Sequence, residues 1–479
     1  MGLDIITQML IQEGLGHAHS FTTAFAAQTG IGTYPVQYFG TVEQKQKYLP
    51  GISSGEIKPC YNLTEPNAGS DALSGKTSAT LTPDGKNYLI NGQKCWITNS
   101  GFSDLFVVFA KVDGQHFTCF LVPADAEGLT LGDEEYKMGI KGSSTRQVFY
   151  SDVKVPVENV VGEIGRGHKI AFNALNMGRI KLGAACVGGA RHALNLSIAY
   201  ASEREQFGST LSKFGAIQYK LAEMATQIFA LESAVYRAAA LLVAAEEYAI
   251  ECAMTKVYGS EVLDYAVDEA VQIHGGNGFS SEYPVDRCYR DSRITRIYEG
   301  TSEINRLLVV NTLIKRVASG RLNINGPITA DDSTDTSPLA AWRKSVGLFK
   351  KATLGLLGEA AQTFEGNLRQ EQQVSMNLSN MVIDVYHAES ILLRTEKIIT
   401  EKGESEAGLY IALCQLYLFD AADRIAKNGK DAIVSFVDGD SIEMLLGILK
   451  DQTAVPAVNV RDLRRKVASR LIGSGKYDL

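Results

Sequence analysis

The spacing of hydrophobic and polar positions divides the chain into parts of different character. Between residues 59 and 165, short stretches rich in β-branched and aromatic residues, such as DLFVVFAKV and HFTCFLV, alternate with turn signals such as PDGKN and VDGQ. This pattern predicts an antiparallel β domain, either a small barrel or a sandwich. Before and after it, hydrophobic residues recur at helical spacing, and the stretch 214–273 contains no proline, as is typical of a helix bundle.

These patterns predict a mainly α protein with a middle β domain. We place a helical N-terminal part at 1–58, the β domain at 59–165, a helical bundle at 166–318, a polar linker at 319–339 and a C-terminal helical extension at 340–479.

Composition excludes several classes of protein. The net charge of -7 argues against nucleic acid as a main partner, and 45% hydrophobic residues are ordinary for a globular chain. We expect no apolar run long enough to cross a bilayer, and the N-terminal sequence lacks the basic segment of a signal peptide. The seven cysteines are scattered without a CxxC pair, which predicts buried thiols in a reducing compartment, and neither disulfides nor a metal site.

The stretch IYEGTSEINR, 297–306, contains the candidate for catalysis. An acid on a loop usually faces water, and that remains one interpretation of Glu299. Its neighbours are a tyrosine and the small residues Gly300 and Thr301, which would let a ligand approach the backbone closely. A carboxylate that loses water in such a setting becomes a better base. Glu299 is therefore a candidate general base.

Four stretches of the chain, in this order, resemble the acyl-CoA dehydrogenase family. They are YNLTEPNAGSD (61–71), CWITNSG (95–101), EREQFG (203–208) with FGAIQYKLAEM (214–224), and the run from QIHGGNGF to TSEINR (272–306). The resemblance implies a helical domain, a β domain and a four-helix bundle. It also implies a flavoprotein that oxidises acyl-CoA thioesters to trans-2-enoyl-CoA and passes electrons to an electron-transfer flavoprotein. The sequence LNMGR (175–179) and the C-terminal extension resemble the very-long-chain branch.

The resemblance makes Glu299 the base that removes the proton α to the thioester carbonyl, while hydride leaves the β carbon for flavin N5. The backbone N–H of Glu299 and a flavin ribityl hydroxyl would hold the developing enolate oxygen. Some branches place the base where Gly178 stands here, so no second acid competes.

The same resemblance implies two groups of FAD contacts and one group of substrate contacts. The first FAD group surrounds the flavin ring and phosphates: Tyr61, Leu63, Thr64, Gly69, Ser70, Trp96, Ile97 and Thr98. The second reaches toward a neighbouring subunit's FAD and the adenosine end: Arg204, Gln206, Phe207, Gln272, Gly275, Gly276, Thr301 and Glu303. The substrate group comprises Ser70, Asn176, Met177, Gly178, Arg179, Tyr298 and Gly300.

Plainer interpretations stand beside these roles. Trp96 could belong to the β core, Arg204 could pair with a neighbouring helix acid, and Arg179 could cap a helix. Gly215 and Glu303 stand where medium-chain members carry glutamines, which departs from their pattern.

The resemblance further implies a homodimer with shared FAD sites, a long-chain acyl-CoA substrate and a role in fatty-acid β-oxidation. The compartment would be the cytoplasm of a bacterium or the mitochondrial matrix of a eukaryote, and membrane association of the extension stays open. The part before residue 59 is shorter than the family's N-terminal domain, so we expect that domain to be partial. Two alternatives remain: an acyl-CoA oxidase and a non-catalytic protein of respiratory-complex assembly.

Overall fold

The computed structural model describes residues 3–244, 248–324, 337–365 and 367–479. It forms two compact units, which are described separately. Unit 1 comprises Met1–Ala185 and Arg290–Glu299, and unit 2 comprises Cys186–Tyr289 and Gly300–Leu479.

Unit 1 opens with short helices. They are α1 (Ile5–Gly14), α2 (His19–Ala26), a π-helical turn η1 (Ala27–Ile31), α3 (Tyr34–Phe39) and α4 (Val42–Ser54). Helix α4 begins with a capping box, in which Thr41 and Gln44 each bind the other's backbone N–H, and it ends before Gly55, whose φ is 84°. The Gln44 amide also donates to the carbonyl oxygens of Glu158 and Val160 at 2.8 Å, which fixes the helix to the β domain.

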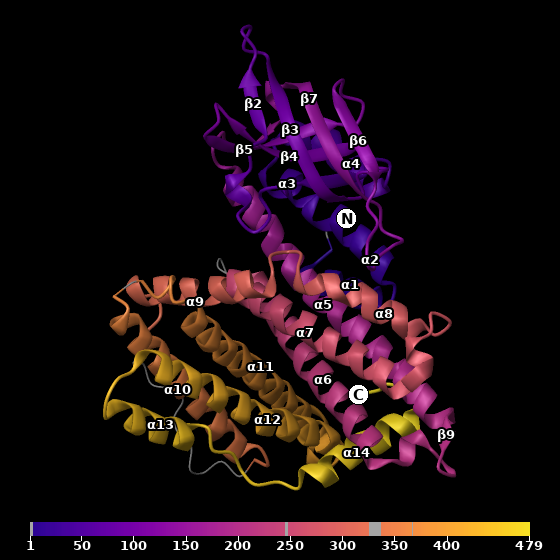
Figure 1. Cartoon of the computed structure of the whole chain (residues 1–479), viewed down its shortest axis with the longest axis vertical. Helices are drawn as coiled ribbons and strands as arrows, with labels where there is room; N and C mark the ends of the chain where they lie inside the picture. The colour runs from indigo at the N-terminus through magenta and orange to yellow at the C-terminus, as the bar shows by residue number, and fades with distance from the viewer. Residues whose placement is uncertain (1–2, 245–247, 325–336, 366) are drawn as a thin grey trace. The chain divides into compact units, whose positions relative to one another are not determined.

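The β domain of unit 1 is one mixed, eight-stranded sheet (Figure 1). Its strands are β1 (Pro59–Asn62), β2 (Ser78–Leu81), β3 (Asn87–Thr98), β4 (Leu105–Val112), β5 (His116–Pro123), β6 (Leu129–Glu134), β7 (Thr145–Pro156) and β8 (Val160–Val161). The order is β6-β7-β3-β2-β4-β5-β8, with β1 beside β4.

The predicted fold class, a mainly α protein with a middle β domain, is confirmed, but the predictions of a wholly antiparallel sheet and of a barrel were wrong. The pairs β1–β4 and β2–β4 are parallel, whereas the other pairs are antiparallel. The sheet also stays open between β6 and β8, so it does not close into a barrel. Alternation of apolar residues is the same in parallel and antiparallel strands, which is why it could not reveal either feature.

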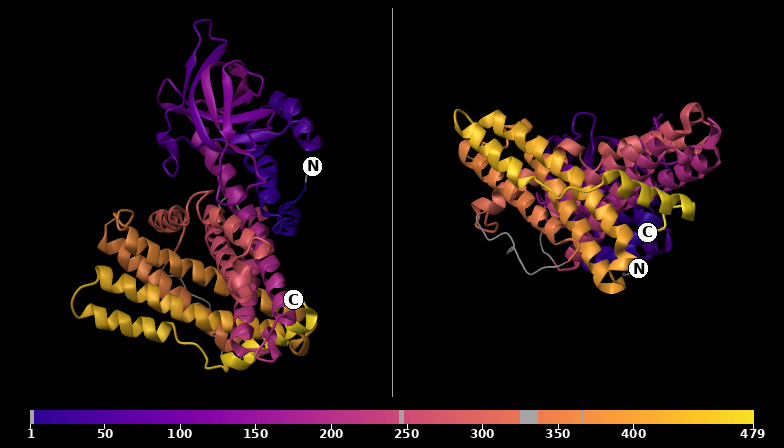
Figure 2. Two further views of the ribbon diagram at one scale, coloured as in Figure 1. Left: turned by 45° about the vertical axis from the view of Figure 1, so that its right-hand side comes forward. Right: turned by 90° about the horizontal axis from the view of Figure 1, so that it is seen from below.

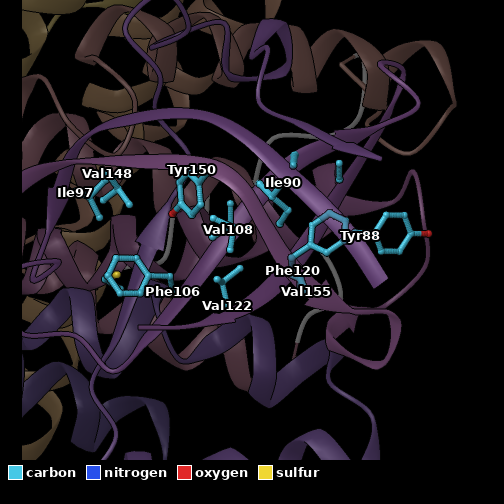
Figure 3. Packing of buried hydrophobic residues seen from close by; sticks show 14 of the residues in the cluster. Tyr88, Ile90, Ile97, Phe106, Val108, Phe120, Val122, Val148, Tyr150 and Val155 are labelled. Carbon is cyan, nitrogen blue, oxygen red and sulfur yellow. The ribbon is translucent and has the colours of Figure 1, made fainter. Parts of the chain in front are cut away.

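Alternate residues of the central strands build the core of the β domain (Figure 3). Phe106 and Val108 of β4 face Phe120 and Val122 of β5 in this cluster, each at most 1% exposed. Burying side chains of this size contributes roughly 1.5–3 kcal/mol each. The core therefore gives a rigid support for the loops at the strand ends.

Helix α5 (Gly167–Glu203) contributes residues to both units. Unit 2 continues with the small hairpin β9 (Glu205–Gln206) and β10 (Ser209–Thr210), followed by α6 (Gly215–Ala244), α7 (Ala249–His274) and the turn η5 (Gly275–Phe279). Helix α8 (Pro284–Ser292) begins in unit 2 and ends in unit 1, which also contains the turn η6 (Arg293–Arg296), and α9 (Ser302–Ala318) belongs to unit 2 again.

The C-terminal extension consists of five helices among the described residues. They are α10 (Ala340–Thr363), α11 (Gln372–Lys402), α12 (Glu404–Phe436), α13 (Ser441–Gln452) and α14 (Val460–Ser474). Helices α10 to α13 pack side by side, and α14 packs along α6 (Figure 2). Most of the predicted linker, residues 325–336, lies outside the described residues.

A half-buried polar cluster connects the extension to the bundle within unit 2. Arg306 of α9 donates to Asn380 of α11 at 2.6 Å and binds Glu261 of α7 at 2.7 Å. On α11, His387 is fully buried and its ring lies against that of Tyr258 of α7, with centroids 3.9 Å apart and planes tilted by 33°. The Arg306 contacts join α9, the helix that follows the candidate base in sequence, to α7 and α11.

The seven cysteines are free and buried, as predicted. The expectation on apolar runs needs a correction. Among the described residues one helix, over Gly215–Val243, has a length and a mean hydropathy of 1.2 that would suffice to cross a membrane. The core helix of a water-soluble protein passes the same test, and α6 is covered here by α7, α11 and α14.

Candidate active site

Glu299 ends the last segment of unit 1, just after the turn η6. Its φ is 59°, a left-handed conformation that is rare and costly for a residue with a side chain. Its Oε2 atom has almost no solvent-accessible surface. The loop therefore holds Glu299 in a defined, strained conformation with its carboxyl group turned inward.

The carboxyl group of Glu299 lies directly on the backbone of Gly178. A Cβ atom built at Gly178 would stand 2.6 Å from Oε2 and 2.8 Å from Oε1 of Glu299. Such distances are far inside van der Waals contact, so the position accepts only glycine while the carboxyl group stays where it is. The sequence had identified Gly178 as a substrate contact and as the absence of a second base, but it had not predicted this contact with Glu299.

Arg179 holds the backbone of the same loop. Its Nε donates to the carbonyl oxygen of Glu299 at 3.0 Å, and a terminal nitrogen donates to Oδ1 of Asn176 at 2.7 Å. The side chain is only 4% exposed. Arg179 therefore fixes the candidate base, a role that differs from the simple helix cap considered above.

Tyr61 of β1 belongs to this group. Its hydroxyl donates to the carbonyl oxygen of Ala171 at 3.2 Å, and its ring lies edge-on to Phe109. Burial raises the pKa of Tyr61 well above its usual value, and the nearby charge of Glu299 raises it further, whereas Arg179 opposes this. Strand β1, helix α5 and the Glu299 loop thus converge within unit 1.

The two predicted flavin segments of unit 1 lie next to each other. The backbone N–H of Cys95 donates to the carbonyl oxygen of Thr64 at 3.0 Å. Trp96 interrupts the β3–β7 register, has a φ of 59° and leaves 60% of its surface exposed, so it is not part of the β core. Ile97 is buried in the β core instead, which leaves its backbone, and not its side chain, for a ligand.

This surface suits a flat cofactor with phosphates. Trp96 offers an exposed ring, and Gly69 and Ser70 are exposed on the neighbouring loop. A Cβ built at Gly69 meets no atom within 4 Å, so the backbone there is open to a ligand. Leu63 is buried, Thr64 is half-buried, and Thr98 pairs with Thr145 at the end of β3.

The second predicted group of FAD contacts lies mostly on an exposed part of unit 2. The ring of Tyr200 stacks on His274 at 4.1 Å, and its hydroxyl accepts from Asn277, which brings the end of α5 to the turn η5. Arg204 follows α5, is exposed, and forms no ion pair with another described residue, in contrast to the helix pairing considered above.

Other members of this group share that exposure. Phe207 is 96% exposed with a φ of 54°, and a Cβ at Gly275 or Gly276 meets no atom within 4 Å. Gln206 and Gln272 are also exposed. The hydroxyl of Thr301 caps α9 by accepting from the N–H of Ile304 at 3.2 Å. The pKa of Glu303 is lowered by its own backbone N–H and by Thr301.

The remaining predicted substrate residues flank Gly178 and Glu299. Met177 is buried, and Asn176, Tyr298 and Gly300 are half-buried. Gly300, the first residue of that part of unit 2, has a φ of 81°, which favours glycine.

Sequence reasoning missed three residues that shape the site. Lys94 and Glu65 form a buried ion pair beneath the predicted flavin loop. Asp291 accepts a hydrogen bond from the backbone N–H of Ile140, whose φ of 46° is unusual for a β-branched residue. Glu65 lies within the quoted motif YNLTEPNAGSD and Lys94 directly precedes CWITNSG, but nothing in the pattern shows that they pair.

Comparison with known proteins gives matches along most of the chain. Four domain families of the acyl-CoA dehydrogenases match the chain. They are the N-terminal domain at 1–56, the middle domain at 60–153, and two C-terminal domains at 165–314 and 348–451. A probable acyl-CoA dehydrogenase of Bacillus subtilis (strain 168) is 42% identical over 100% of this chain and 85% of its own length.

Two further matches differ in how much they cover. The mitochondrial very long-chain specific acyl-CoA dehydrogenase of Homo sapiens is 44% identical over 59% of this chain and 45% of its own length. The crystal structure of an acyl-CoA dehydrogenase complexed with FAD from Bacillus anthracis has a TM-score of 0.96 at 42% identity, and covers 100% of this chain and 86% of that one.

Proposed function

Because this chain belongs to the acyl-CoA dehydrogenase family, we propose that it oxidises acyl-CoA thioesters to trans-2-enoyl-CoA with Glu299 as the catalytic base. The single observation that carries the assignment is the placement of the Glu299 carboxyl group on Gly178, with its backbone held by Arg179. Any side chain at position 178 would displace the carboxyl group.

The residues around Glu299 explain how it would act as a base. The proton α to a thioester carbonyl is weakly acidic, so the base must be aimed at it closely. Arg179 and the strained backbone fix the direction of the carboxyl group, and the N–H of Glu299 would hold the enolate oxygen. Gly300 lets the thioester lie against the loop.

The residues that would hold FAD are those implied by the resemblance to the family, and several of them, such as Trp96, Gly69 and Ser70, are exposed. In unit 1 they are Tyr61, Leu63, Thr64, Gly69, Ser70, Trp96, Ile97 and Thr98. In unit 2 they are Arg204, Gln206, Phe207, Gln272, Gly275, Gly276, Thr301 and Glu303. FAD, when bound, supplies the acceptor for the hydride that leaves the β carbon. The planar guanidinium of Arg204 suits a pyrophosphate.

We further propose that the protein is a homodimer in which Arg204 and the Gln272–Gly276 turn serve the FAD of the partner. Exposure supports this proposal, because Arg204, Phe207 and Gly275 all present open surface in the single chain. The electron acceptor would be an electron-transfer flavoprotein. The alternative, an oxidase that uses oxygen, has the same first half-reaction.

Long-chain substrates and a role in β-oxidation complete the proposal. The extension over 348–451 and the glycine at 178 support it, since both resemble the very-long-chain branch. Each further methylene group of the acyl chain that is buried should contribute roughly 0.8 kcal/mol to the free energy of binding.

The decisive experiment begins with the purified protein. We expect it to carry FAD and to bleach when palmitoyl-CoA is added without oxygen, with formation of the 2-enoyl product. Failure to bleach with any saturated acyl-CoA from four to eighteen carbons, despite bound FAD, would contradict the proposed reaction. Oxygen consumption compared with reduction of an electron-transfer flavoprotein then separates oxidase from dehydrogenase.

A further inference from the structure

A buried ion pair joins strand β3 to the loop that follows β1. The Lys94 side chain is 1% exposed and that of Glu65 is 9% exposed, and Nζ of Lys94 lies 2.7 Å from Oε1 of Glu65. Nζ also donates to the carbonyl oxygen of Leu63 at 3.0 Å. By contrast, the Lys58–Asp104 pair of the same unit is 36% and 47% exposed. The Lys94–Glu65 pair is therefore part of the interior.

The Glu65 carboxylate organises its own loop from within. It accepts from the backbone N–H of Lys76 at 2.6 Å and from that of Thr77 at 3.1 Å. The backbones of Glu65 and Ala68 exchange two hydrogen bonds, of 3.2 and 3.0 Å, which close a tight turn. A Cβ at Gly75 would stand 2.8 Å from Oε1. The Glu65 side chain thus connects the start of the loop to its end at Lys76 and Thr77.

The electrostatics agree with a tightly paired site. Burial raises the pKa of Glu65, but Lys94 and the donors on the loop outweigh it, so the net pKa is lowered. Burial lowers the pKa of Lys94, and Glu65 opposes that change. Each residue of the pair therefore favours the charged form of the other.

Stability alone gives a weak reason for such a pair. Removing two charges from water costs several kcal/mol per ion, and apolar residues of similar volume often stabilise a protein as well or better. What the pair does achieve is geometric. It fixes Leu63 and, through the loop turn, Gly69 and Ser70 on one side. On the other side it anchors β3 just before Trp96, where the register shift turns the indole outward.

We propose that Lys94 and Glu65 are positioning residues of the FAD site, which hold the 63–70 loop and Trp96 in the arrangement that binds the cofactor. The proposal rests on the proposed function, since it assumes that these segments bind FAD. Neither side chain needs to touch the cofactor. The pair acts by keeping the loop and the indole in register with each other.

The test compares single and double substitutions in the full-length protein. Lys94→Met keeps the length of the side chain and leaves Glu65 buried without its partner, and Glu65→Gln leaves the lysine without its counter-charge. The double variant, Lys94→Met with Glu65→Gln, removes both charges. Lys58→Met, which breaks the exposed pair, is the matched control. For each apoprotein we would measure the thermal midpoint and the FAD dissociation constant, and for each holoprotein the visible circular dichroism of the flavin.

The single variants should lose both thermal stability and FAD affinity, because each leaves an uncompensated buried charge. The double variant should recover most of the stability and yet bind FAD roughly tenfold more weakly, within the range of coupled contacts, with an altered flavin dichroism. Lys58→Met should match the wild type in both measurements.

Three outcomes are to be distinguished. If the double variant recovers stability and also binds FAD with wild-type affinity and dichroism, the pair is purely structural and the inference is wrong. If the single variants unfold, the double variant still decides the question. If the wild-type apoprotein itself binds no FAD, the proposed function fails, independently of the pair.

Discussion

Replacing Gly178 by alanine tests the geometry of the candidate base directly. The added Cβ would stand 2.6 Å from Oε2 of Glu299, which is 0.8 Å short of the 3.4 Å at which ordinary contact begins. The helix backbone at 178 cannot retreat easily, and Arg179 holds the Glu299 backbone. The carboxyl group must therefore move by nearly 1 Å or rotate away.

A displacement of about 1 Å from the reacting geometry can cost roughly 10²-fold in rate. Stability should respond differently. Alanine is favoured over glycine inside a helix by about 1 kcal/mol, while overpacking costs about 1–3 kcal/mol. The two effects oppose each other, so the thermal midpoint should change little while flavin reduction slows greatly.

The assay is anaerobic stopped-flow reduction of the bound flavin by palmitoyl-CoA, combined with thermal unfolding. Gly355→Ala is the matched control, because Gly355 also lies inside a helix and a Cβ there meets no atom within 4 Å. A Gly178→Ala protein that reduces its flavin at the wild-type rate would refute the placement of Glu299 over Gly178 or its role as the base.

Three further predictions concern the cofactor, the substrate and the extension. Arg204→Ala should lower FAD occupancy and loosen the dimer together, as measured by absorbance and analytical ultracentrifugation; a wild-type monomer with stoichiometric FAD would contradict the shared site. Across saturated acyl-CoA substrates with one artificial acceptor, kcat/KM should rise from butyryl- toward palmitoyl-CoA and then level off; an optimum at butyryl- or hexanoyl-CoA would contradict the long-chain proposal alone. Burial lowers the pKa of His387 to about 3 from its usual 6.5. Below pH 6.5 the unfolded state therefore binds a proton that the folded state does not. The free energy of unfolding should then fall by about 1.4 kcal/mol per pH unit. Denaturant titrations at pH 7.5 and 5.5 measure how much the free energy of unfolding falls between the two pH values. This fall should be roughly 1 kcal/mol smaller for His387→Phe than for the wild type, and equal falls would show that this histidine titrates normally.

The family, the enzyme class and FAD as cofactor were predicted from the sequence and are confirmed. Motifs such as YNLTEPNAGSD and IYEGTSEINR made this possible, since their residue types are tied to one chemistry in one order. The change from strand to helix pattern likewise revealed the mixed architecture, because each period reflects local backbone geometry.

Contacts between distant parts of the chain could not be predicted in the same way. The contact between the Glu299 carboxyl group and Gly178 joins residues that no periodic pattern relates. The same is true of the hydrogen bond from Arg179 to the Glu299 carbonyl oxygen. The outward turn of Trp96 depends on a register shift that a strand pattern does not contain. Lys94 would be read as an exposed strand residue, since a buried lysine is rare unless it is paired.

The most direct test of the central claim is single-turnover flavin reduction by Glu299→Gln. Glutamine keeps the shape of the side chain and the backbone N–H, but it cannot accept the α proton. We expect the variant to bind FAD and palmitoyl-CoA as the wild type does, and to reduce its flavin more slowly by the roughly 10²–10⁴-fold typical of a lost general base. Reduction at close to the wild-type rate would show that another group removes the proton.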